Sequence, residues 1–154
     1  MLGKKTAVIY FSHTGVTKSL VEKFPLEEGD KVIELIPAEP YPKSYFKTLA
    51  RAKVEIEGGV EVKIENGKMD LGLYDRILLG FPIWFWTCPK IIKTFITEND
   101  LRGKTIYPFC TSGGIDITEA VDEIKRNADG AIVKKGMRFK KKYSEKALKE
   151  WLEQ

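Results

Sequence analysis

Hydroxyl side chains and a glycine gather near the start of the chain, in the stretch Ser12-His13-Thr14-Gly15-Val16-Thr17. An apolar run, residues 7–11, comes before this stretch, and apolar residues at helical spacing follow it. A turn between a strand and a helix directs its own N–H groups and the first free N–H groups of the helix toward one point. The hydroxyls can add donors, and Gly15 lets a ligand approach the backbone. The stretch therefore predicts a phosphate-binding turn.

Two further loops carry groups that suit a flat ligand with a phosphate. The apolar run 76–81 leads into an aromatic loop that contains Pro82, Ile83, Trp84, Phe85 and Trp86. The run 104–110 leads into small residues, namely Thr111, Ser112, Gly113 and Gly114. Three consecutive large aromatic residues cannot all point inward, because adjacent side chains diverge, so at least one should be exposed or line a cleft. Together the three loops predict a pocket for a flat heteroaromatic ring with a phosphate tail.

The elements that position these loops alternate between strand and helix. The apolar runs predict strands at 6–11, 31–36, 76–81 and 104–110, and a fifth strand that begins at 131–134. The helical spacings predict helices at 17–24, 42–57, 89–97, 116–128 and 144–153, the last with Ser144 as its N-cap. Residues 60–64 suit either a small hairpin arm or a loop that carries an edge strand. This alternation predicts the α/β class, with a parallel sheet covered by helices on both faces in three layers.

Composition narrows the class of protein. The 154 residues suit a single domain over 1–154, and no apolar run reaches the roughly 20 residues that span a bilayer. The beginning of the chain lacks the pattern of a signal peptide, so we expect a cytoplasmic protein. Cys88 and Cys110 form no C-x-x-C motif and are expected to be buried thiols, and the single histidine argues against a Cys/His metal site. The net charge of +4 is too small to indicate nucleic-acid binding.

Two features of the sequence, a histidine and a run of basic residues, can each be interpreted in two ways. His13 is expected to be either an exposed loop imidazole or a partner of the phosphate. The densest run of basic residues is either a solvated face or a docking surface for an acidic redox partner. It consists of Lys134, Lys135, Arg138, Lys140, Lys141 and Lys142.

The chain resembles flavodoxin-like proteins over nearly its whole length. The resemblance lies in residues 10–17, 74–84 and 103–114, which contain the three loops in order. It is strongest to the short, single-domain members with a Pro-Ile-Trp loop and a Thr-Ser-Gly-Gly loop. Residues 41–55 also resemble the second helix of that subgroup. The resemblance implies a doubly wound sheet of five strands in the order 2-1-3-4-5, which brings the three loops together at the carboxyl ends of neighbouring strands.

The resemblance also implies a non-covalently bound FMN. Ser12, Thr14, Gly15, Val16 and Thr17 would hold the phosphate, with His13 beside them. The residues of the second loop, Pro82, Ile83, Trp84 and Phe85, would line the isoalloxazine ring, with Trp86 close by. Thr111, Ser112, Gly113 and Gly114 would flank the other side of the ring.

The sequence departs from the flavodoxin pattern at three places. Val16 stands where many relatives have asparagine, and Phe85 stands where electron carriers often have a glycine. A positive φ at Phe85 should cost about 1 kcal/mol or more. The third loop lacks the tyrosine that commonly stacks on the flavin of electron carriers, which leaves one face of the ring open.

Phe85 and the bare third loop favour an oxidoreductase of the NAD(P)H:quinone type, with a quinone or similar flat acceptor, whereas the small size and the lack of an evident nicotinamide site favour a carrier. Two alternatives stay open. One is an electron carrier that serves protein partners, and the other is a non-redox module that binds a different phosphorylated ligand or a protein. No dinucleotide-binding or P-loop motif occurs in the chain. The sequence leaves the oligomeric state open between a monomer and a homodimer.

Overall fold

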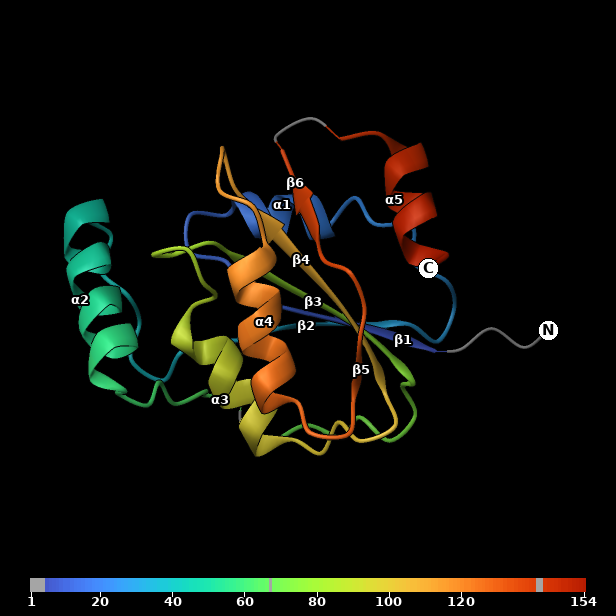
Figure 1. Cartoon of the computed structure of the whole chain (residues 1–154), viewed down its shortest axis with the longest axis horizontal. Helices are drawn as coiled ribbons and strands as arrows, with labels where there is room; N and C mark the ends of the chain where they lie inside the picture. Colours follow the sequence, from blue (N-terminus) through green and yellow to red (C-terminus); the bar gives the residue numbers. More distant parts are fainter. Residues whose placement is uncertain (1–4, 67, 141–142) are drawn as a thin grey trace.

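The computed structural model describes residues 5–66, 68–140 and 143–154, which form a parallel sheet with helices around it (Figure 1). The strands are β1 (Thr6–Tyr10), β2 (Lys31–Glu34), β3 (Arg76–Pro82), β4 (Thr105–Thr111), β5 (Ile132–Val133) and β6 (Met137–Phe139). The helices are α1 (Val16–Val21), α2 (Tyr45–Gly58), α3 (Lys90–Glu98), α4 (Thr118–Asn127) and α5 (Glu145–Leu152). In the described part of the chain, no helix is both long and apolar enough to cross a membrane.

The strand order is β2-β1-β3-β4-β5, and every pairing along it is parallel. This confirms the predicted α/β fold and the predicted order 2-1-3-4-5. The central strands β1, β3 and β4 are buried along almost their whole length. Continuous apolar runs suit such strands because helices cover both faces of the sheet. The carboxyl ends of these three neighbouring strands therefore share one edge.

The core has two parts, one on each face of the sheet. On one face, α1 and α5 pack against Val8, Leu78, Tyr107 and Phe109. On the other face, α2, α3 and α4 pack against alternate residues of the same strands, such as Ile9. In Figure 1, α3 and α4 lie in front of the sheet, while α2 stands at one side of it. The predicted three layers are thus present.

The fifth strand, predicted to begin at 131–134, is interrupted after two residues. The chain forms two short strands, β5 and β6, which both pair in parallel with β4. Gly136 lies between them and packs directly against α4, because a Cβ built there would lie 2.7 Å from Val121 and 2.8 Å from Ile117. This close approach gives a physical reason for the break between the two strands.

The second helix begins later than predicted. The expected range 42–57 places Pro42 in the first turn, but α2 begins at Tyr45 and ends at Gly58. Ser44 is the N-cap, and its side chain accepts a hydrogen bond from the Lys47 N–H. Ser144 caps α5 in the same way, as predicted. The carbonyl of Pro42 instead accepts a hydrogen bond of 2.7 Å from the Thr48 hydroxyl.

Residues 60–64 form a loop at the edge of the sheet rather than a hairpin arm. Ile64 makes an isolated antiparallel bridge with Pro37. The Asn66 side chain extends this edge, since its amide donates to the carbonyl of Glu34 and its oxygen accepts from the Ile36 N–H. The loop thereby supplies partners to backbone groups just beyond β2.

Candidate functional site

The loops that follow β1, β3 and β4 lie along one edge of the sheet. Pro82 and Thr111, the last residues of β3 and β4, are partners in the strand register. The Phe11 N–H, just beyond β1, donates a hydrogen bond of 3.0 Å to the carbonyl of Gly80. The hydroxyls of Thr17 and Thr111 share a hydrogen bond of 2.9 Å, which ties the first loop to the third. The three loops predicted to form one pocket therefore share one location.

The first loop forms a turn with free backbone donors, here called the phosphate turn (residues 12–17). Gly15 has φ +92°, which glycine adopts without strain, and a Cβ built there would meet no atom within 4 Å. The Ser12 hydroxyl accepts a hydrogen bond of 3.2 Å from the Lys18 N–H. Among the described residues, no acceptor is found for the backbone N–H groups of residues 13–17. These donors, with open space beside Gly15, fit a phosphate at the start of α1.

The second loop contains a tight turn over Trp84–Thr87, here called the aromatic turn. Trp84 and Thr87 exchange two backbone hydrogen bonds, of 2.9 Å and 3.1 Å. The central residues, Phe85 and Trp86, have φ of 50° and 68°. Two positive φ angles are typical of a type I′ turn, which normally carries asparagine and glycine. The positive φ expected to be costly at Phe85 is therefore already present, and the two hydrogen bonds of the turn help to offset it.

The aromatic turn divides its three large side chains between core and surface. Trp84 is only 8 % exposed and packs edge-on against Phe11, Tyr41 and His13. Phe85 is 37 % exposed and Trp86 is 63 % exposed. The expectation that at least one of the three rings reaches the surface is confirmed. The available aromatic surface belongs to Phe85 and Trp86 rather than to Trp84.

The third loop, residues 111–115, is organised around Ser112. Its hydroxyl accepts hydrogen bonds from the N–H groups of Gly114, at 3.4 Å, and Ile115, at 3.0 Å. Its carbonyl accepts a hydrogen bond of 3.2 Å from Arg138. A Cβ built at Gly113 or Gly114 would meet nothing within 4 Å, so this loop leaves open space beside it. The hydrogen bonds to Ser112 thus hold the shape of the loop, while Gly113 and Gly114 add no side chains that would fill the space beside it.

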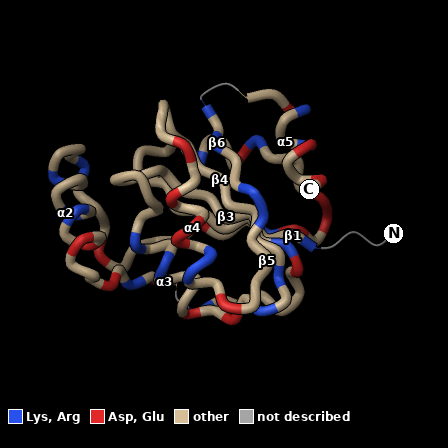
Figure 2. The backbone as a smooth tube through the Cα atoms, viewed as in Figure 1, with Lys and Arg blue, Asp and Glu red and all other residues tan. Residues whose placement is uncertain are grey.

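The phosphate turn and the aromatic turn contain no Lys, Arg, Asp or Glu. Figure 2 shows charged residues elsewhere, including basic residues along the segment that carries β5 and β6. A phosphate at this edge would therefore be met by backbone dipoles rather than by a charged side chain of either turn. Lys141 and Lys142 of the predicted basic run lie outside the described residues.

Tyr41, Arg51 and Glu55 form a polar group, here called the supporting unit, which contacts the aromatic turn where the Tyr41 ring packs against Trp84. The sequence did not reveal this role. The Tyr41 hydroxyl donates to the carboxylate of Glu55, which is 6 % exposed. The Arg51 guanidinium forms a 3.0 Å ion pair with the same carboxylate and lies 4.1 Å above the Tyr41 ring. Burial, followed by the bond to Glu55, raises the pKa of Tyr41. The i,i+4 spacing of Arg51 and Glu55 was visible in the sequence, but nothing indicated Tyr41 as their partner.

His13 is neither an exposed imidazole nor a charged group. Its Nε2 lies 3.2 Å from the Thr48 hydroxyl of α2, and its ring packs against Tyr41 and Trp84. Burial lowers the pKa of His13 from its usual 6.5. His13 therefore connects the phosphate turn to α2 in its neutral form near pH 7.

The lowered pKa of His13 predicts a dependence of stability on pH. Below pH 6.5 the unfolded chain takes up a proton on His13 more readily than the folded chain, so the contribution of neutral His13 falls as the pH drops below 6.5. We expect the stability difference between the wild type and His13→Gln to shrink between pH 7.5 and pH 5. Urea unfolding of both proteins across this range measures it. A difference that stays constant, or grows toward pH 5, would refute the prediction.

Both cysteines are buried, as predicted. Burial raises the pKa of each thiol to about 12, with the charge of Arg138 partly opposing this at Cys110. Each side chain is therefore a protonated thiol at neutral pH, a form with little nucleophilic or redox reactivity.

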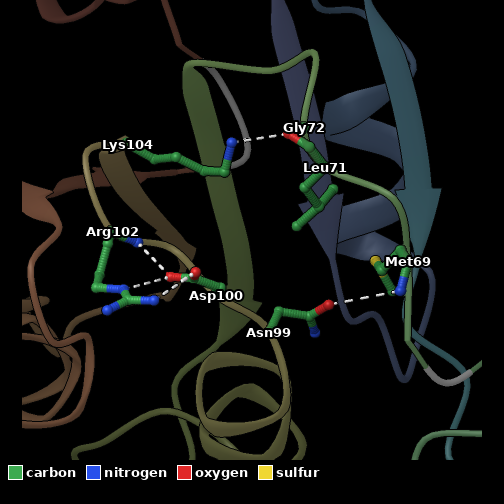
Figure 3. Close-up of a pocket in the computed structure, with 7 residues that line it drawn as sticks. All are labelled: Met69, Leu71, Gly72, Asn99, Asp100, Arg102 and Lys104. Carbon is green, nitrogen blue, oxygen red and sulfur yellow. Dashed lines mark hydrogen bonds and ion pairs between the residues drawn. The ribbon is translucent and has the colours of Figure 1, made fainter.

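A hollow of about 340 Å³ lies at the opposite end of the sheet, beside the segments that lead into β3 and β4. Figure 3 shows its lining residues, among them Lys104, Asp100 and Arg102. The Lys104 ammonium donates to the carbonyls of Leu71 and Tyr74, while Arg102 pairs with Asp100. The hollow contains none of the predicted site residues, and these charged groups already have partners. We assign it to the connection between segments rather than to the site.

The fold is that of a known family. A family model described as Flavodoxin matches residues 5–154, and the chain belongs to the flavodoxin family. Among curated proteins, none matches the chain.

Several solved structures are similar over almost their entire length. A protein of Bacteroides eggerthii, provisionally named a flavoprotein, is 34 % identical with a TM-score of 0.87, over 98 % of this chain and 97 % of that one. A second such protein, from Bacteroides uniformis, is 31 % identical with a TM-score of 0.79, over 99 % of both chains. A flavoprotein of Lactobacillus acidophilus, solved in complex with FMN, is 26 % identical with a TM-score of 0.76, over 97 % of this chain and 99 % of that one.

Proposed function

We propose that this chain is a single-domain oxidoreductase that moves electrons through a non-covalently bound FMN. The observation that carries the proposal is the set of free N–H groups of the phosphate turn, at the edge where the aromatic turn presents Phe85 and Trp86. Membership of the flavodoxin family supports FMN as the cofactor, and so does the FMN complex of the similar Lactobacillus acidophilus protein.

The residues of the three loops fit the two ends of FMN. Backbone N–H groups of residues 13–17 would hold the phosphate, helped by the hydroxyls of Thr14 and Ser12. Phe85 and Trp86 offer exposed aromatic surface for the ring, and Gly113 and Gly114 leave open space on the side of the third loop. FMN would supply the redox chemistry, while the chain binds it and sets its surroundings.

We favour an enzyme of the NAD(P)H:quinone type over a pure electron carrier. The narrow Ser112–Gly114 loop carries no large side chain that would cover a ring, which leaves room for a flat acceptor such as a quinone. An electron carrier for an acidic protein partner is the second candidate, favoured by the basic residues along β5 and β6. Stopped-flow mixing of the FMN-loaded protein with NADPH separates the two, because only the enzyme is reduced rapidly without a protein partner.

FMN binding itself is tested by titration of the cofactor-free protein with FMN, with two matched glycine variants. Gly15 and Gly59 both have positive φ, of 92° and 63°, and a Cβ at either would meet no atom within 4 Å. Gly15→Ala and Gly59→Ala should each cost about 1–2 kcal/mol of stability through backbone strain. Gly15→Ala should also weaken FMN binding at least tenfold, because it strains the turn that carries the N–H donors.

Gly59→Ala at the end of α2 should leave the affinity for FMN unchanged. A wild-type protein that remains colourless after addition of FMN would overturn the proposed function and favour the non-redox module. If both variants lost the same affinity for FMN, the phosphate turn would not be part of the binding site.

A further inference from the structure

Arg138 links the short strand β6 to the third loop. In the parallel register it is the partner of Cys110, so it lies beside the carboxyl end of β4. Its guanidinium Nη1 donates a hydrogen bond of 3.2 Å to the carbonyl of Ser112. The Ser112 hydroxyl also accepts hydrogen bonds from the N–H groups of Gly114 and Ile115. Through Ser112, Arg138 is therefore linked to the residues that define the conformation of the loop.

The charge of Arg138 is not engaged in a close ion pair in the described part of the chain. The side chain is half-buried. Its field reaches the nearby carboxylate of Asp116, whose pKa is lowered first by hydrogen bonds from Thr118 and then by Arg138. A half-buried cation without an ion-pair partner acts over a longer range than an exposed one, because solvent screens it less.

We propose that Arg138 is a positioning residue that fixes the Ser112–Ile115 loop and maintains a positive charge at the ring side of the site. This inference rests on the proposed function, which places the loop beside the flavin ring. A cation there favours the cofactor after it has gained electrons, because the added negative charge is attracted to it. Arg138 therefore raises the reduction potential of the bound cofactor.

The positioning role can be tested without any cofactor. Arg138→Gln removes the charge and the bond to Ser112, whereas Lys140→Gln removes one positive charge from an exposed residue of the same segment. We expect the amides of Gly114 and Ile115 to exchange hydrogen about tenfold faster in Arg138→Gln and at the wild-type rate in Lys140→Gln. Amides of β3 serve as the internal reference for global stability. Unchanged exchange at both loop amides would overturn the positioning role.

The electrostatic role is tested on the FMN-loaded protein by titration with dithionite as reductant. In Arg138→Gln, reduced FMN should lose about tenfold more affinity than oxidised FMN, which equals a fall of about 30 mV in the two-electron potential. Arg138→Lys should recover most of this shift but not the slow exchange of the loop amides, since lysine keeps the charge and lacks the planar donor fork. A potential equal to that of Lys140→Gln would overturn the electrostatic role. If the wild type binds no FMN, the proposed function fails, while the exchange experiment still decides whether Arg138 positions the loop.

Discussion

Replacement of Gly80 by alanine is expected to destabilise the folded chain by about 3 kcal/mol. Gly80 lies in the middle of the sheet on β3, and a Cβ built there would lie 2.1 Å from Cζ and 2.3 Å from Cε2 of the Phe109 ring. Carbon atoms in contact are normally 3.5–4.0 Å apart, so either the ring or the strand must move.

The Phe109 ring has little room to move. It is fully buried and packs against the rings of Phe24, Phe139 and Trp151. A shift of β3 would in turn disturb the hydrogen bond from the Phe11 N–H to the Gly80 carbonyl, next to the phosphate turn. Overpacking at this position therefore affects both the core and the edge that carries the site.

Urea unfolding of the cofactor-free protein measures the effect. Gly113→Ala is the matched control, because a Cβ at Gly113 would meet nothing within 4 Å and its stability should change by less than about 0.5 kcal/mol. The second change Phe109→Leu should recover part of the loss in Gly80→Ala by removing the ring. If Gly80→Ala and Gly113→Ala unfold at the same urea concentration, the Phe109 ring does not prevent a larger side chain at position 80, and the prediction is wrong.

The sequence predicted the strands best where burial dominates. Strands β1, β3 and β4 are continuous apolar runs, a pattern typical of strands that are buried on both faces of a sheet. Their predicted limits differ from the observed ones by about one residue. The sequence did not predict that the last strand divides into β5 and β6, with Gly136 packed against Ile117 and Val121 between them. Such contacts join residues far apart in the chain and leave no local periodicity.

The loops were predictable as positions but not as conformations. The three loops could be placed at one edge because parallel strands bring their carboxyl ends together. Which ring of the aromatic turn points inward depends on positive φ angles at Phe85 and Trp86, residue types that rarely adopt them. The contact of Arg138 with Ser112 depends in turn on the pairing of β6 with β4, which the predicted single last strand did not contain.

This division of the aromatic turn leads to the second large effect. Trp84→Ala is expected to cost about 3 kcal/mol or more, because it removes a ring packed among Phe11, Tyr41 and His13 and leaves a cavity. Trp86→Ala is expected to change stability by less than about 0.5 kcal/mol, because that ring is 63 % exposed. The two substitutions remove the same side chain from positions two residues apart.

The affinity for FMN should respond differently from stability. Under the proposed function, Trp86→Ala loses exposed aromatic surface beside the ring and should weaken FMN binding about tenfold, since base-like rings stacked on an aromatic residue typically gain about 1–3 kcal/mol. Urea unfolding of both cofactor-free variants, followed by FMN titration of each, gives the two measurements. A stable Trp84→Ala variant that has lost FMN binding would mean that the Trp84 ring leaves the core to contact the cofactor. Since Trp84 contacts both His13 of the phosphate turn and Tyr41 of the supporting unit, its burial is what joins the aromatic turn to the rest of the site.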